Sequence, residues 1–385
     1  MSSVNSINIP PSKSTVQVSI IDTTFNGKVP TAPFMGPPIK GFHTWYPVAY
    51  SFLVTHKDPS GSDRNVIFDL GSPTDMVNDF PPVIAESIKD LVAGVEGGHL
   101  TATKNVSEIL AESGFALENI ESVIWSHAHS DHSGRPSLFP SSTSLIVGPG
   151  LKEAYFPGWP ACQDSPVLGR EFEGREVTEL GLGRFDLELG GLKAMDYFGD
   201  GSFYLCSAPG HAVGHINALA RTSEDTFIYF AADSVHHPAE LRPHSGALMP
   251  TSVHLPGNHH CCSSRPFRDV HPANDFSRVP PHYHAAMDAP HGGPENTPFQ
   301  LPSETADGWT LAAELQAARD TVKAVQRFDA SPDILVVSAH DTSLHPILDY
   351  FPKVANDWKR KGWKERGQWG FLRELEGATK LHGQE

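Results

Sequence analysis

The sequence predicts a protein of the α/β (α+β) class, built as a four-layer αββα sandwich. Two observations carry this prediction. Five apolar, β-branched runs each stop at a polar residue of a type that binds metals, and such runs are typical of strands covered on both faces. Two further segments repeat apolar residues at helical spacing. Because strands dominate, we expect two sheets packed face to face, with helices on their outer surfaces.

The strand runs share one property, which is the polar residue that follows each of them. The runs occupy residues 66–68, 123–125, 203–205, 227–230 and 334–337. The polar residues that follow are, in the same order, Asp69, a histidine cluster that begins at His127, His211, Asp233 and His340. Since each of them follows the end of a predicted strand, we expect these side chains to gather along one edge of the sandwich.

The two helices are predicted from their apolar spacing. Val106, Ile109 and Leu110 form a short apolar face, and Gly114 ends that helix. The second helix is predicted over residues 311–325, where apolar side chains recur at helical spacing over about four turns.

Three segments rich in proline and glycine follow neither pattern, namely residues 26–46, 157–174 and 238–303. The first also carries aromatic side chains, and such loops commonly form pocket walls. We predict that Phe42 and Trp45 contact the substrate. The third segment is longer than a plain connection and is interpreted as a lid or an insertion. Its eight histidines lack ligand spacing, so a second metal site is not favoured there.

The chain of 385 residues is long enough to bury a large core. We expect one domain over residues 16–350, with the insertion at 238–303 inside it. A tail at 1–15 is expected to precede the domain, and a helical extension at 351–385 to follow it.

Composition narrows the class of partner. The formal charge of −16, from 29 Lys and Arg against 45 Asp and Glu, argues against nucleic acid. No window approaches twenty apolar residues and no secretory signal begins the chain, so we expect a cytoplasmic protein without membrane association. The four cysteines are predicted to be reduced thiols. A small molecule is the expected partner, and the oligomeric state is left open.

Residues 126–134 are the most informative segment, because three imidazoles and a carboxylate fall within six residues directly after an apolar run. Imidazole suits borderline cations such as zinc. With further ligands from elsewhere in the chain, the set exceeds what one tetrahedral ion needs. The segment therefore predicts a metal site and points to two ions.

The motif HAHSDH at 127–132 resembles the HxHxDH signature of the metallo-β-lactamase superfamily. Later positions continue the likeness, with His211 in PGHAVGH, Asp233 in FAADSVHH and His340 in VVSAHD. The resemblance spans nearly all of the predicted domain. It implies a hydrolase with the four-layer sandwich of that superfamily.

The resemblance also implies how the ligands divide between two zinc ions. It assigns His127, His129 and His211 to one ion, Asp131, His132 and His340 to the other, and Asp233 to a bridging position. Two ions about 3.5–4 Å apart share a water that becomes a hydroxide nucleophile at neutral pH. Asp131 is predicted to act as acid and base as well as ligand. The imidazole of His129, where di-iron oxidoreductases of the superfamily place Glu, favours zinc over redox chemistry.

The position three residues after the bridging aspartate departs from the family pattern. Lactone-opening members often place a tyrosine there, and this chain has His236. A simple acyl-homoserine lactone is therefore disfavoured, and His236 is predicted to donate a hydrogen bond to the substrate carbonyl. We expect His215 and His237 to support the ligands, Asp341 to orient a histidine, and His345 to be structural.

The sequence thus predicts a dinuclear zinc hydrolase that opens a lactam, cyclic carbamate or lactone of a small, largely apolar molecule. Its aromatic loop and long insertion resemble fungal members of detoxification and secondary metabolism. Two alternatives stay open. One is a thioesterase of the same superfamily that acts on acyl thioesters. The other is a degenerate metal-binding or scaffold protein, which the complete ligand set disfavours.

Overall fold

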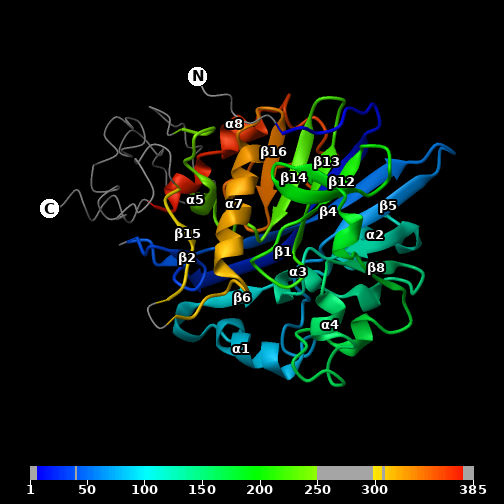
Figure 1. Ribbon diagram of the computed structural model, residues 1–385. Helices are drawn as coiled ribbons and strands as arrows, with labels where there is room; N and C mark the ends of the chain where they lie inside the picture. Colours follow the sequence, from blue (N-terminus) through cyan, green and yellow to red (C-terminus); the bar gives the residue numbers. More distant parts are fainter. Residues whose placement is uncertain (1–6, 40, 249–297, 306–307, 376–385) are drawn as a thin grey trace.

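The computed structural model describes residues 7–39, 41–248, 298–305 and 308–375. Within these residues, two large sheets face each other and helices lie outside them (Figure 1). The strands of the first sheet are, in spatial order, β3 (Thr44–Trp45), β1 (Val16–Pro30), β4 (Val48–Lys57), β5 (Asp63–Phe68), β7 (Ile120–Ile124), β8 (Ser144–Val147) and β9 (Val177–Glu179), with β6 (His99–Thr101) paired to β1. From β5 to β9 neighbouring strands are parallel.

The second sheet is antiparallel except at its last pair, β14 and β16, which is parallel. Its strands are, in spatial order, β10 (Leu187–Leu189), β11 (Leu192–Asp196), β12 (Phe203–Ser207), β13 (Ile216–Arg221), β14 (Phe227–Ala232) and β16 (Ile334–Ser338). A separate short pair joins β2 (Met35–Gly36) to β15 (Leu301–Pro302). All five predicted strand runs fall on strands of the two large sheets.

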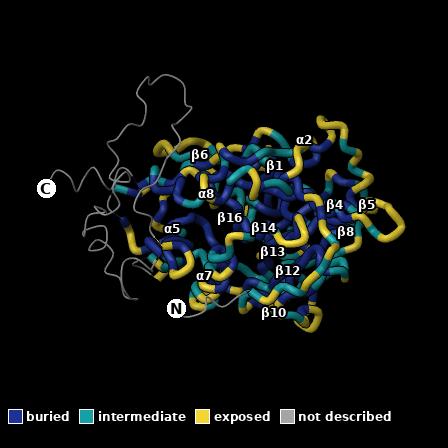
Figure 2. Tube along the Cα trace, turned by 90° about the horizontal axis from the view of Figure 1, so that it is seen from above, coloured by how far each residue is buried: buried dark blue, intermediate teal, exposed yellow. Residues whose placement is uncertain are grey.

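Alternate side chains of the central strands face different apolar layers. Val66 of β5 and Phe230 of β14 lie in the core between the sheets, where Phe230 stacks on Phe52 with ring centroids 3.9 Å apart. Their neighbours Ile67 and Tyr229 face outward, into two further apolar clusters beneath the helices. Figure 2 shows the strands as the buried interior and the outer loops as the exposed parts. The predicted four-layer sandwich is confirmed.

Helices cover both outer faces. Helices α2 (Val106–Glu112) and α4 (Leu151–Tyr155) lie over the first sheet, and α7 (Leu315–Asp329) lies along the second (Figure 1). The other α-helices among the described residues are α1 (Pro82–Val92), α3 (Ser130–Ser133), α5 (Pro238–Leu241) and α8 (Trp363–Gly367). Within the described ranges, none has the length and apolar character needed to cross a membrane.

Both predicted helices are present, but the second begins at Leu315 and not at residue 311. The backbone amides of Ala313 and Glu314 bind the carbonyls of His211 and Gly210, so this stretch pairs with a neighbouring loop and does not continue the helix. This contact ties α7 to the loop that carries His211.

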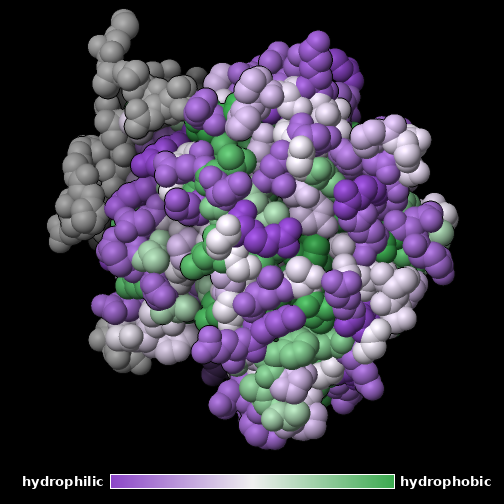
Figure 3. Space-filling model, turned by 45° about the vertical axis from the view of Figure 1, so that its right-hand side comes forward, coloured by the Kyte–Doolittle hydropathy of each residue, from purple (hydrophilic) through white to green (hydrophobic). Residues whose placement is uncertain are grey.

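Residues 351–375 pack into the body of the fold. Trp358 and Trp363 lie in the core between the sheets, and Phe371 joins the cluster around Trp45. Lys364 is also buried and donates hydrogen bonds to three backbone carbonyls. Figure 3 shows a largely hydrophilic surface with separate hydrophobic patches.

Most of the predicted insertion, residues 249–297 with seven of its eight histidines, lies outside the described residues. At its beginning, the Arg242 guanidinium donates two hydrogen bonds, of 2.8 and 2.6 Å, to the carboxylate of Asp329. His244 contacts the same carboxylate at 3.0 Å. This buried cluster fastens the segment after α5 to the end of α7.

Replacement of Asp329 should therefore destabilise the fold strongly. Asp329→Ala leaves the Arg242 cation buried without its partner, which costs about 3–5 kcal/mol. Urea unfolding followed by circular dichroism measures this change. Asp320→Ala, which removes an exposed carboxylate paired with Lys323 on the same helix, is the matched control and should change stability little. Equal stability of the two variants would contradict this account of the cluster.

Candidate metal centre

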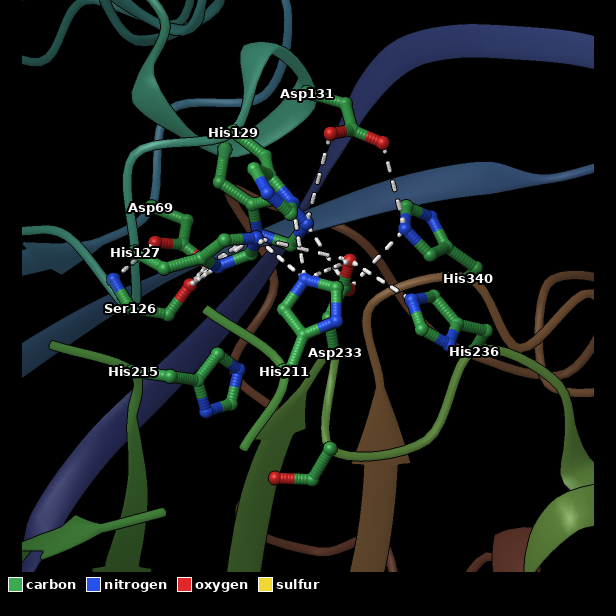
Figure 4. Close-up of polar contacts among 12 residues, drawn as sticks. Asp69, Ser126, His127, His129, Asp131, His211, His215, Asp233, His236 and His340 are labelled. Atoms are coloured by element: carbon green, nitrogen blue, oxygen red, sulfur yellow. Dashed lines mark hydrogen bonds and ion pairs between the residues drawn. The ribbon is translucent and has the colours of Figure 1, made fainter. Parts of the chain in front are cut away.

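The loops that follow the strand ends converge on one site, as the sequence predicted. The HAHSDH segment follows β7 and continues into α3, the loop after β12 carries His211, and Asp233 and His340 follow β14 and β16. Figure 4 shows these side chains pointing toward one another around Asp233. The structure thus brings together all seven predicted metal ligands.

The seven side chains form two groups, and the donor atoms of each group lie within 4.8 Å of one another. The first group contains His127, His129, His211 and Asp233, and the second contains Asp131, His132 and His340. This grouping matches the division that the family resemblance implied.

Asp233 faces both groups through different oxygen atoms. Its Oδ2 lies 3.4 Å from His211 Nε2 and 3.8 Å from His127 Nε2. Its Oδ1 lies 3.0 Å from His132 Nε2 and 3.2 Å from His340 Nε2. A carboxylate in this position can contribute one oxygen to each of two cations.

The site is closed on most sides. His127, His132, His211, Asp233 and His340 each expose at most 4% of their surface. His129 and Asp131 are less buried, and 24% of the Asp131 side chain is exposed while its Oδ2 lies 3.4 Å from His340 Nε2. A substrate therefore has access to the centre from the Asp131 side.

Residues behind the ligands fix the orientation of two rings. The Asp69 carboxylate binds His132 Nδ1 at 2.8 Å and accepts hydrogen bonds from the amide and hydroxyl of Ser126. The Nδ1 atom of His340 donates to the Val48 carbonyl at 2.6 Å. In both rings the outer nitrogen is held, so Nε2 faces the site, which is how supporting residues orient metal ligands.

Gly210 is required at its position before His211. Its φ of 120° is unfavourable for other residues, and a Cβ atom there would overlap the backbone nitrogen of Ala318 in α7. The close contact with α7 fixes the position of the loop that carries His211.

The electrostatics of the cluster fit a cation. Burial raises the pKa of Asp233, but His132 and His340 outweigh burial and hold that pKa well below its ordinary value. Burial lowers the pKa of His127 and of His211 well below the ordinary value, so both imidazoles are neutral, the form that binds metal.

Two buried donor atoms of the cluster lack hydrogen-bond partners, which also fits a site for a cation. His132 Nε2 and Asp233 Oδ1 lie 3.0 Å apart, yet both are buried without a well-aligned hydrogen bond among the described residues. Buried polar atoms normally have partners. The imidazole and carboxylate donors point into a shared space, and such a donor set suits zinc.

His236 lies beside the first group, with its Nε2 3.7 Å from Asp233 Oδ2 and its ring against that of His211. Sequence reasoning missed the residue behind it, Glu240. This fully buried carboxylate accepts hydrogen bonds from the amides of His236 and His237 and lies 3.6 Å from His236 Nδ1. A glutamate at the third position of a helix that begins with Pro238 was an available capping signal.

The predicted substrate contacts at Phe42 and Trp45 need correction. Both side chains are buried, with 2% and 1% of their surfaces exposed, because Phe42 packs on His237 and Trp45 packs on His340. The aromatic residue of this loop that lines the space beside His236 is Phe34. That space has a volume of about 10 Å³, which is room for one water molecule.

The remaining predicted neighbours differ in their roles. His215 packs against His127 and His211, as expected of a supporting residue. His237 caps the first turn of α5. Asp341 accepts hydrogen bonds from Ser343, so the expectation that it orients a histidine was wrong. His345 pairs with Asp22 at 3.1 Å, in line with a structural role.

Comparison with known proteins finds several fungal relatives that match almost the whole chain. A protein called gamma-lactamase FDB1, from Fusarium pseudograminearum, is 37% identical over 371 residues, which cover 94% of this chain and 83% of that protein. A protein called metallo-hydrolase mfmC, from Annulohypoxylon moriforme, is 37% identical over 375 residues, which cover 96% and 90%. No protein-family model matches the sequence.

Several solved structures resemble the fold. One of them is an N-acyl homoserine lactone hydrolase with N-hexanoyl-L-homoserine bound at its catalytic metal centre. The two structures superpose with a TM-score of 0.50 at 12% identity, covering 89% of this chain and 99% of the other. At this identity the likeness concerns the arrangement of sheets and helices.

Loss of the Asp69 carboxylate should weaken metal binding. Asp69→Asn removes the charged acceptor that holds His132, and loss of such a supporting partner typically lowers metal affinity about 10–100-fold. Competition with a chromophoric chelator measures zinc affinity in both proteins. The control is Asp75→Asn, at an exposed loop position six residues away. Equal affinities of the Asp69 variant and the unmodified protein would remove Asp69 from the support of the site.

Proposed function

Because this chain belongs to the metallo-β-lactamase superfamily of hydrolases, we propose that it is a dinuclear zinc enzyme that opens a cyclic amide or ester. The substrate class we propose is a lactam, cyclic carbamate or lactone of a small, largely apolar molecule. The proposal rests on the position of Asp233, because its two carboxylate oxygens face two separate groups of imidazole nitrogens. The name of one relative, a gamma-lactamase, supports the same class of substrate.

The proposed ligands divide as the two groups do. His127, His129 and His211 hold one ion, Asp131, His132 and His340 hold the other, and Asp233 serves both. A pair of zinc ions supplies a hydroxide nucleophile at neutral pH and polarises a carbonyl group. The chain needs no serine or cysteine nucleophile for this chemistry, and Cys206 is buried within the core beneath α7.

Asp131 is proposed to move the proton. Its carboxylate lies at the exposed side of the site, within 3.4 Å of His340 and 3.9 Å of His132. It therefore lies where the substrate has access, and it accepts the proton of the nucleophile and returns it to the leaving nitrogen or oxygen. Exclusion of water on the remaining sides strengthens the electrostatic interactions within the site.

His236 is proposed to donate a hydrogen bond to the substrate carbonyl. Its Nε2 faces Asp233, and its ring contacts both His211 and Phe34. Glu240 holds the backbone of His236, so the ring is fixed beside the first group of ligands. Entry of a substrate on this side requires Phe34 to move, because the present space holds one water.

The proposed reaction is tested by a substrate panel with metal removal. Hydrolysis of γ-lactams, cyclic carbamates, lactones and acyl thioesters is measured with purified protein, after chelation, and after zinc is restored. We expect ring opening of at least one cyclic class, loss of turnover on chelation, and recovery with zinc. Turnover of thioesters alone would replace the proposal with the thioesterase alternative. Activity that survives complete metal removal would reject both.

Asp131→Asn should abolish most of the turnover, since a positioned acid or base contributes about 10²–10⁴-fold to rate. The same preparation should keep the metal of the His127 group, because Asp131 belongs to the other group. Steady-state kinetics and metal content are measured together. Unchanged kcat in the Asn variant would exclude Asp131 from proton transfer.

His236→Ala should lower kcat by about 10²–10³-fold, which is the effect of losing one oxyanion donor. His236→Gln keeps a side-chain donor and should recover part of the rate. The control is His345→Ala, which alters a half-exposed histidine paired with Asp22 and should leave kcat unchanged. If the Ala and Gln variants retain full kcat, His236 has a packing role alone.

A further inference from the structure

A cavity of about 980 Å³ lies between the first sheet and the C-terminal turns, next to His340, which contacts two of its wall residues, Val48 and Phe25. None of the seven proposed ligands lines it. Its walls include Phe25, Tyr46, Val48 and Pro346, together with the charged residues Arg373 and Glu374. Its volume falls at the upper end of the range for small-molecule sites.

Arg373 is the unusual member of this wall. Its Nε atom is buried without a hydrogen-bond partner, and no hydrogen bond or ion pair joins its guanidinium to another residue in the described part of the chain. Four pairs of polar side chains involve other members of the wall, although Glu374 Oε2 is buried without a hydrogen bond and lies 3.6 Å from His237 Nε2. The pairs are Asp22 with His345, Asn26 with His99, Thr342 with Glu374, and Ser343 with Asp341.

The buried Nε–H of Arg373 has lost water without gaining a partner, which is costly, whereas the side chain as a whole is only partly buried. Burial lowers the pKa of Arg373, and the neighbouring Glu374 only partly offsets this. The group stays cationic, since an arginine cannot lose its proton in proteins. Its planar fork of donors matches a carboxylate in a bidentate arrangement.

We propose that this cavity is a second small-molecule site, which binds a monocarboxylate that has an apolar body. The Arg373 guanidinium would bind the carboxylate, and the walls formed by Phe25, Tyr46 and Pro346 would bury the apolar part. Glu374 lies beside Arg373 and repels anions, so a singly charged carboxylate is favoured over a dianion such as phosphate. The proposal goes beyond the hydrolysis proposed above and does not depend on it.

Phenylacetate is the probe. Its binding to the metal-loaded protein is measured by isothermal titration calorimetry and by ligand-observed NMR. We expect saturable binding of phenylacetate and none of inorganic phosphate. Arg373→Met keeps the aliphatic stem and should weaken binding about 10–100-fold, the loss expected for a charged hydrogen-bonded pair. Arg373→Lys should recover part of the affinity. The matched control, Arg360→Met, removes an exposed arginine and should bind like the unmodified protein.

Tyr46→Ala provides a second test that does not alter Arg373. Tyr46 is half-exposed at the rim, so its removal should leave the fold intact and weaken binding of phenylacetate more than binding of acetate. Phenylacetate binding that persists in Arg373→Met and disappears on chelation would place the carboxylate at the metal centre and overturn the proposal. Absence of saturable phenylacetate binding at millimolar concentration would also overturn it.

Discussion

The Asp233 carboxylate lies between two groups of imidazoles, and the rest of the site depends on this position. One of its oxygens faces His211 and His127, and the other faces His132 and His340. A buried carboxylate is unfavourable unless positive charge surrounds it. The supporting contacts of Asp69 and of the Val48 carbonyl hold two of these imidazoles with a nitrogen toward this one residue.

The imidazoles reach Asp233 because strands of both sheets end at the same edge of the sandwich. Asp233 and His340 follow the parallel strands β14 and β16, so their spacing is set by the sheet itself. The HAHSDH segment arrives from the first sheet, where Asp69 follows the adjacent strand β5 and holds the His132 ring. Because each group takes side chains from both sheets, packing of the apolar core between the sheets also sets the distances within each group.

The sequence carried enough information to predict the layers and the seven side chains that the structure brings together, for physical reasons. Buried strands require continuous apolar runs, and metal ligands need particular residue types at strand ends, so both leave a local signal. The contacts of Phe42 and Trp45 could not be predicted in this way, because an aromatic loop residue packs inward or outward according to its neighbours. Phe34, and not these two, reaches the space beside His236. Glu240 carried a local capping signal, whereas Arg373 gains its significance from wall residues distant in sequence, which a local pattern does not reveal.

Anomalous X-ray diffraction from crystals of the purified protein tests the central claim most directly. Data collected on both sides of the zinc absorption edge locate each ion and identify its element. The account predicts two zinc peaks, one among His127, His129 and His211, the other among Asp131, His132 and His340, with Asp233 next to both. A single peak, or zinc bound away from Asp233, would contradict it.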